Sequence, residues 1–354
     1  MTIKTKKLQD MEILRTFAII LIVGFHSLTY LQFPYKELIY GGYIADIGLS
    51  LFLFISGFLL YYNYKDINFK NGLKTFYYKR AVRIYPLYWF ALIVTFASLI
   101  YAYGFISFPT NQPTAILSFS TLLSGVLGLQ GLTEGNTGLN LSLFWFIGVI
   151  LIYYFLYPFF TKPKNLINMF SVSLILFFAL YLLSFKLNII TLLFFFYWMF
   201  FAGIAICWLN DNYKSFKNIK TYFKDMTFKR LFEHVLPLLL LILLLQTSPN
   251  INWIYIIILL LITLIIYAMG KFLVSYLTKD YRGFFNSVTY SIITKISYGS
   301  YAIYLLHVTI FAIIAVMIIK FQLNGFQNLI FLSGIPISFI VGYYVQIVES
   351  KLIR

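Results

Sequence analysis

The chain has 354 residues, of which 61% are hydrophobic and only 11% are charged. A soluble globular protein of this length carries about a quarter charged residues, so the composition excludes that class. Several runs approach or exceed the roughly 18 apolar residues that a spanning helix needs. The sequence therefore predicts an all-α, multi-pass membrane protein.

Ten transmembrane helices are predicted from the apolar runs. In chain order they cover residues 12–31, 44–62, 84–107, 142–160, 166–185, 189–209, 235–248, 251–275, 297–319 and 327–349. A further stretch, residues 115–132, is apolar but rich in Ser and Gly. It is either an eleventh span or an interfacial or re-entrant segment.

The positions of the 27 Lys and Arg residues orient the chain. With ten spans and both termini in the cytoplasm, all of these residues except Lys36, Lys186 and Lys320 fall in cytoplasmic segments. That bias follows the positive-inside rule, whereas an eleventh span at 115–132 would move most of the basic residues outside. We therefore predict ten spans, cytoplasmic N- and C-termini and a location in the cell membrane.

The excess of basic residues is explained by orientation and by anionic lipid headgroups, so no nucleic-acid partner is predicted. The bases are scattered over short loops beside membrane helices. Residues 1–354 are predicted to form one polytopic domain with no separate soluble domain. Membrane lipids are its expected surroundings.

The three histidines are His26, His234 and His307. His234 lies at the inner end of a predicted span beside a basic loop, which favours a packing role. His26 lies deep in the first apolar run, and its neutral ring can take a proton near neutral pH, as a general base must. A buried histidine that ties two helices together is the alternative interpretation.

Arg15 precedes His26 by eleven residues in the segment LRTFAIILIVGFHS. Eleven residues of α-helix advance about 1100°, three turns plus roughly 20°, so both side chains share a face about 16 Å apart. The pattern predicts one group near the cytoplasmic surface and one near the midplane. Arg15 alone is also consistent with an anchor whose charge reaches back to the membrane surface.

A second basic group lies in YYKRAVRIYPLYWF, where Arg80 and Arg83 are three residues apart with Lys79 alongside. Guanidinium groups match phosphate oxygens in pairs, so two of them at a membrane surface can hold a phosphorylated donor. A plain anchor to the inner leaflet is the other possibility.

Several segments together carry a resemblance to a known family. They are the Arg15–His26 spacing, RAVR at 80–83, DIGLSLFLFISGFLL at 46–60, LFWFIGVILIYYFLYPFF at 143–160 and SYGSYAIYLLH at 297–307. In this order the chain resembles the acyltransferase-3 family, integral-membrane enzymes that acylate sugars and cell-surface polymers. The resemblance extends over nearly the whole chain and agrees with ten spans.

The resemblance implies roles for particular residues. His26 would be the catalytic base with Arg15 on its helix, and Arg80 and Arg83, with Lys79, would hold the acyl donor. The serine-glycine element falls on Ser56 and Gly57, and His307 matches a histidine of many members. Ser56 and His307 are therefore predicted on the substrate side, with packing as the alternative role of His307. Many members carry a glutamate where this chain has Ile150, which points to the subgroup associated with exopolysaccharide modification.

We therefore predict O-acyl transfer from a cytosolic acyl-CoA, either acetyl-CoA or succinyl-CoA, to a hydroxyl of an extracytoplasmic glycan. No metal is predicted. His26 would deprotonate the acceptor or first take the acyl group itself, and both routes remain open. The alternatives are a glycan or small-anion exporter and a lipid-binding sensor without turnover.

Overall fold

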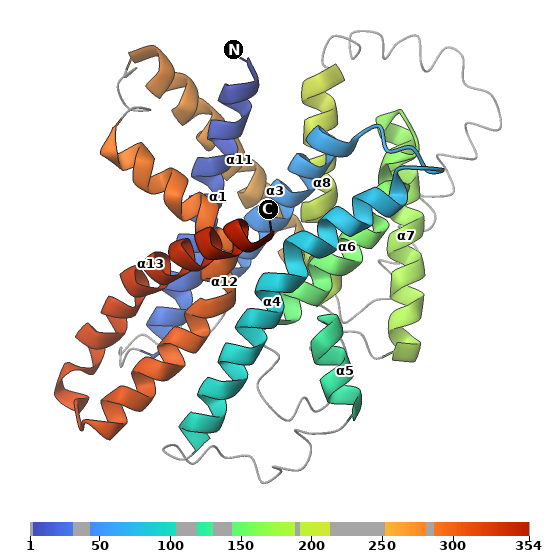
Figure 1. Cartoon of the computed structure of the whole chain (residues 1–354). Helices are drawn as coiled ribbons and strands as arrows, with labels where there is room; N and C mark the ends of the chain where they lie inside the picture. The colour runs from blue at the N-terminus through green and yellow to red at the C-terminus, as the bar shows by residue number, and fades with distance from the viewer. Residues whose placement is uncertain are drawn as a thin grey trace, which may run out of the picture. The chain divides into compact units, whose positions relative to one another are not determined.

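The computed structural model describes residues 3–30, 43–103, 119–129, 144–187, 192–212, 252–280 and 287–353. This part of the chain is all-α, with no β-strand (Figure 1). Nine of the ten predicted helices are present: α1 (Ile3–Tyr30), α3 (Tyr43–Tyr64), α4 (Leu73–Tyr103), α6 (Trp145–Thr161), α7 (Leu166–Leu187), α8 (Leu192–Asn212), α11 (Trp253–Asp280), α12 (Val288–Lys320) and α13 (Gln327–Ile353). The predicted helix at 235–248 and His234 lie outside the described residues.

Within the described ranges, eight of these helices are long and apolar enough to cross a membrane, and α6 is apolar but shorter, with 17 residues. The ambiguous stretch at 115–132 contains α5 (Phe119–Leu127), a helix of nine residues. Nine residues rise about 13.5 Å, less than half of a hydrocarbon core of roughly 30 Å. By itself α5 is therefore too short to span.

Three helices begin well before the predicted positions: α1 at Ile3, α4 at Leu73 and α12 at Val288. Hydrophobicity places each start where the apolar run begins, but backbone hydrogen bonds extend the helices into more polar sequence. At α12 the side chain of Ser287 caps the start by accepting a hydrogen bond from the Tyr290 N–H at 3.2 Å. The basic group Lys79–Arg83 therefore lies on α4.

Contacts divide the chain into two compact units. Unit 1 comprises Met1–Phe52, Val82–Ser118 and Leu261–Arg354, and unit 2 comprises Leu53–Ala81 and Phe119–Leu260. The helices α3, α4 and α11 each contribute residues to both units. That residues 1–354 act as one membrane domain stays a prediction.

In unit 1, α12 and α13 form a hairpin closed by the short 3-10 turn η5 (Asn324–Phe326; Figure 1). Small residues bring the two helices together: a Cβ added to Gly299 would lie 2.9 Å from the Cα of Tyr343, and one added to Gly342 would overlap Ile303. Such small residues are typical of helix pairs in membranes, where close packing replaces a hydrophobic driving force.

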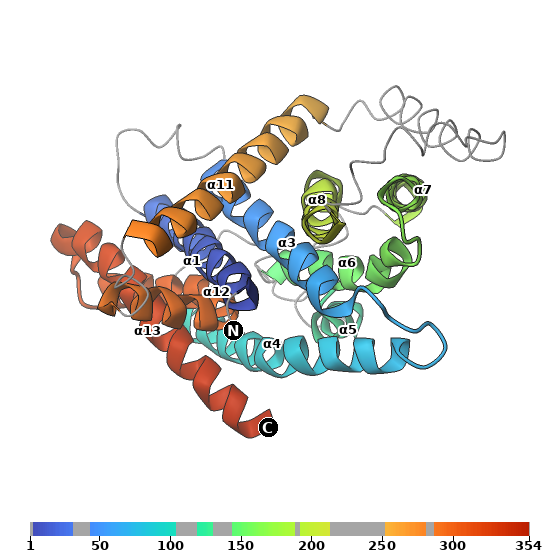
Figure 2. The same ribbon diagram turned by 90° about the horizontal axis from the view of Figure 1, so that it is seen from above.

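Also in unit 1, α1 lies along α12 (Figure 2). The Tyr290 hydroxyl donates to the Glu12 carboxylate, and the Thr16 hydroxyl donates to the Ile293 carbonyl at 2.8 Å. Residue numbers rise together in these pairs, so the two helices are parallel. Since α13 returns antiparallel to α12, the start of α1 and the end of α13 lie at the same end of unit 1. Which end faces the cytoplasm stays a prediction.

Unit 2 contains α6, α7 and α8 around an aromatic core. Its fully buried rings include Tyr153, Tyr157, Phe160, Phe177, Tyr197 and Phe200. Two glycines join α3 to α8 reciprocally, because a Cβ on Gly57 would overlap the Phe200 carbonyl oxygen and a Cβ on Gly203 would overlap that of Phe54. The absence of a side chain at Gly57 therefore permits a close approach between α3 and α8.

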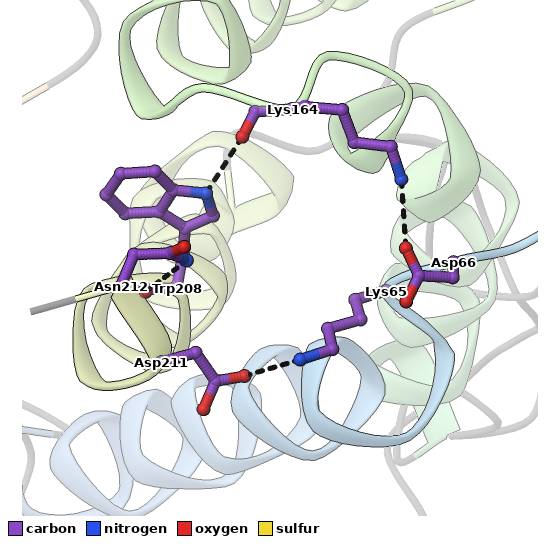
Figure 3. A network of polar contacts seen from close by, with 6 residues as sticks. All are labelled: Lys65, Asp66, Lys164, Trp208, Asp211 and Asn212. Carbon is purple, nitrogen blue, oxygen red and sulfur yellow. Dashed lines mark hydrogen bonds and ion pairs between the residues drawn. The ribbon is translucent and has the colours of Figure 1, made fainter. Parts of the chain in front are cut away.

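In unit 2, polar contacts link three segments: the residues that follow α3, the turn that precedes α7, and helix α8 (Figure 3). Lys65 pairs with Asp211 at 2.9 Å, Lys164 pairs with Asp66 at 3.0 Å, and the Trp208 indole N–H donates to the Lys164 carbonyl at 3.1 Å. The hydrogen bond that Lys65 donates to the Asp211 carboxylate raises the pKa of the Lys65 amine. Exposed ion pairs contribute at most about 1 kcal/mol each, so these contacts orient the helix ends more than they stabilise them.

Candidate functional site

Two histidines meet in unit 1, one from α1 and one from α12. Nε2 of His307 lies 3.3 Å from Nδ1 of His26, and the ring centroids are 4.8 Å apart at an interplanar angle of 73°. Nδ1 of His26 also lies 2.9 Å from the Ile22 carbonyl oxygen, one turn earlier in α1. Nδ1 of His307 lies 2.7 Å from the Tyr304 carbonyl oxygen. The pair is thus part of a chain of polar contacts between two helices.

The partners of these nitrogens determine where the protons lie. A carbonyl oxygen only accepts, so Nδ1 of each histidine carries a proton. In neutral rings, Nε2 of His307 then bears a lone pair and accepts from Nδ1–H of His26. Nε2 of His26 likewise bears a lone pair, and it is the atom that can take a proton or attack a carbonyl carbon.

The surroundings of the pair are largely apolar. His307 is only 2% exposed, with the ring of Phe311 edge-on to it at 6.5 Å, and the ring of Phe25 lies edge-on to half-buried His26 at 5.2 Å. Two residues farther along α12, the buried hydroxyls of Thr309 and Thr95 are 2.6 Å apart and join α12 to α4. Low polarity strengthens hydrogen bonds, so this is an environment in which an oriented imidazole is held firmly.

Arg15 keeps the relation to His26 predicted from the spacing. The helix α1 is unbroken from Ile3 to Tyr30, so Arg15 lies on the His26 face and about 16 Å away along the axis. Its side chain is half-buried. Both members of the predicted catalytic pair, Arg15 and His26, belong to unit 1.

Arg80 lies in unit 2, among aromatic side chains. Its Nη2 donates to the Tyr64 hydroxyl at 3.0 Å, and its Cζ is 5.0, 5.9 and 6.0 Å from the ring centroids of Tyr64, Phe76 and Tyr154. Its Nε is buried with no hydrogen-bond partner among the described residues. A planar cation held against aromatic faces is well oriented and retains donors for an anionic ligand.

Ser56 shares a neighbour with Arg80. The Ser56 and Tyr154 hydroxyls are 3.4 Å apart, and the Tyr154 ring is one of those beside Arg80. Tyr154 and Tyr64 therefore contact predicted site residues, although neither was predicted from the sequence. With 30 tyrosines in the chain, no sequence signal distinguished these two.

The remaining predicted donor-binding residues, Lys79 and Arg83, are exposed on α4. Arg83 belongs to unit 1, where its charge acts on the carboxylate of Glu349 in α13. The predicted site residues thus form two groups. Arg15, His26, His307 and Arg83 belong to unit 1, and Ser56, Lys79 and Arg80 belong to unit 2.

Comparison with protein families decides the class of this chain. The model of the acyltransferase-3 family, described as an acyltransferase domain, matches residues 8–347. The chain belongs to the acyltransferase-3 family. With its long apolar helices, it is a multi-pass membrane acyltransferase. No curated protein and no solved structure matches the chain.

Proposed function

We propose that this acyltransferase moves an acetyl or succinyl group from cytosolic acyl-CoA to a hydroxyl of an extracytoplasmic glycan in the cell membrane. The observation that carries the proposal is the imidazole of His26 in an apolar helix, with its Nδ1 2.9 Å from the Ile22 carbonyl oxygen and 3.3 Å from Nε2 of His307. Family membership supports acyl transfer in general. The resemblance of the motifs supports the glycan acceptor and the CoA donor.

On the donor side, the basic residues of α4 hold the phosphates of CoA. The guanidinium of Arg80 donates to the Tyr64 hydroxyl and lies beside three aromatic rings, one of them that of Tyr64 itself. Arg83 and Lys79 add exposed positive charge at the same end of the helix. Arginine forks bind phosphate oxygens through paired, charge-assisted hydrogen bonds. Arg15 adds positive charge on the helix that carries His26.

The chemistry takes place at Nε2 of His26. In direct transfer, Nε2 takes the proton of the acceptor hydroxyl while the hydroxyl oxygen attacks the thioester carbonyl. The C–S bond then breaks, and the thiolate of CoA leaves and recovers the proton. In the covalent route, Nε2 attacks the carbonyl first, and the C–S bond breaks to release the thiolate of CoA. The acceptor oxygen then attacks the acyl group, the bond between the acyl carbon and Nε2 breaks, and the hydroxyl proton goes to the thiolate. Both routes release one free CoA for each acyl group transferred.

The test is release of free CoA by purified protein in lipid, supplied with acetyl-CoA or succinyl-CoA and a panel of cell-surface oligosaccharides. A positioned base contributes about 10²–10⁴-fold, so His26→Ala is expected to lower turnover by that factor while the protein stays folded. His234→Ala is the matched control, since it removes the histidine predicted to pack at a helix end.

Each outcome separates one alternative. Release that needs an acceptor and is lost in folded His26→Ala supports the proposal. No release with either donor from intact protein refutes CoA-dependent transfer and favours export of a glycan or small anion. Equal release by wild type and His26→Ala supports CoA-dependent transfer but refutes a catalytic role for His26.

A further inference from the structure

We propose that His307 is the positioning residue for His26: its Nε2 accepts the Nδ1 proton of His26 and thereby keeps the lone pair on Nε2 of His26. The inference rests on the proposed function and deepens it. It gives His307 a role other than the substrate contact that the sequence predicted.

The ring of His307 is fixed in one orientation. Nδ1 faces two backbone carbonyls of its own helix, those of Tyr304 at 2.7 Å and Ile303 at 3.2 Å. A ring flip would replace this donor with a C–H group and leave Nδ1 without those acceptors, at a site that is 2% exposed. His307 therefore presents Nε2 to α1 as an acceptor.

Two neighbouring acceptors favour the same proton position on His26. Its Nδ1–H is shared between the Ile22 carbonyl at 2.9 Å and Nε2 of His307 at 3.3 Å. A free imidazole in water prefers the other tautomer, with the proton on Nε2, and that tautomer would remove the lone pair needed for chemistry. Two acceptors on the Nδ1 side hold His26 in the reactive form.

Nε2 of His307 also stabilises His26 during the reaction. In direct transfer, the imidazolium formed at His26 donates its Nδ1–H to His307 through a charge-assisted bond until the thiolate takes the Nε2 proton. In the covalent route, the acyl-imidazolium passes its Nδ1 proton to Nε2 of His307 and returns it when the acyl group leaves. A neutral imidazole fulfils this role without a permanent buried charge, which is costly inside a membrane segment.

The first experiment compares kcat and KM for the acyl donor in three variants. His307→Phe keeps a ring without an acceptor, His307→Gln supplies an amide oxygen near the position of Nε2, and Phe311→Leu alters the packing around His307 but leaves Nε2 in place. Loss of a hydrogen bond to a charged group is expected to lower kcat by about 10- to 100-fold in His307→Phe with KM unchanged. His307→Gln should recover most of that loss, and Phe311→Leu should show none.

An equal loss of kcat in Phe311→Leu, or no loss in His307→Phe, would overturn the inference, because packing alone would then explain the contact. A rise in KM with kcat unchanged would also overturn it and return His307 to the substrate side.

The second experiment reads the proton position without turnover. Ring-¹⁵N-labelled histidine in the full-length protein gives signals from three residues, and His26→Gln identifies that of His26. We expect His26 as the Nδ1–H tautomer, with a shift toward Nε2–H in His307→Phe. The Nε2–H tautomer in wild type would refute the positioning role whatever the activity. Wild type with the Nδ1–H tautomer but no CoA release would refute the proposed function and leave the histidine pair standing.

Discussion

The reciprocal glycine contact between α3 and α8 predicts that one methyl group will destabilise unit 2. In Gly203→Ala, the new Cβ would overlap the Phe54 carbonyl oxygen and would lie 2.8 Å from the Phe58 nitrogen. These are backbone atoms of a helix and cannot rotate away as a side chain would. The two helices must therefore separate.

The magnitude follows from two opposing effects. Overpacking of a tight contact costs about 1–3 kcal/mol, and a gap of 0.5–1 Å along the rest of the contact weakens its dispersion attraction. Replacing Gly by Ala within a helix returns up to about 1 kcal/mol. Because the clash is with backbone, the upper end of the cost applies, and the net loss is about 1–2 kcal/mol. The unfolding equilibrium constant then rises about 5- to 30-fold.

Gly24→Ala is the matched control, because a Cβ on Gly24 in α1 meets no atom of the described residues within 4 Å. The same substitution should there be neutral or stabilising by up to about 1 kcal/mol. Unfolding of each variant by SDS titration in mixed micelles, followed by tryptophan fluorescence, gives the free energies. Equal destabilisation at Gly24 and Gly203, or full stability of Gly203→Ala, would contradict the reasoning from close approach.

Two further predictions concern the polar contacts. Thr95→Val and Thr309→Val should each lower the free energy of unfolding by about 1 kcal/mol. The double variant should lose less than the sum of the two, because no buried hydroxyl is then left unpaired. Additive losses in a double-mutant cycle would argue against the hydrogen bond. Arg80→Lys keeps the charge but loses the planar guanidinium beside Tyr64, so KM for acyl-CoA should rise about tenfold with kcat nearly constant. The control Lys74→Met, on the same helix, should change neither constant. An unchanged KM in Arg80→Lys would show that Arg80 does not bind the donor.

The spans could be predicted from the sequence because hydrocarbon thickness sets the length of each apolar run. The helix starts could not. The apolar run that predicts a start at residue 84 says nothing about whether Leu73–Arg83 outside the hydrocarbon is also helical, and in α4 it is. The division into two units likewise depends on which helices pack together, a property of pairs that no single run contains.

The candidate site shows the same limit at the level of residues. Arg15 and His26 share a helix, so their common face follows from the spacing alone. His26 and His307 are 281 positions apart, and only tertiary packing brings their rings together. The contacts of Tyr64 with Arg80 and of Tyr154 with Ser56 could not be predicted from the sequence, because aromatic residues are abundant throughout the chain.

The register between α1 and α12 determines whether the two histidines meet at all. Two contacts near the start of α12 set this register: Tyr290 donates to Glu12, and Thr16 donates to the Ile293 carbonyl. His26 follows Glu12 by fourteen residues, about 21 Å along the axis. A slip of one residue would move α12 by about 1.5 Å and turn His307 through about 100° relative to α1. The Nδ1–H of His26 would then lose its acceptor on the neighbouring helix. These polar contacts between α1 and α12 therefore act on the imidazole of His26 through helix register, without touching its ring.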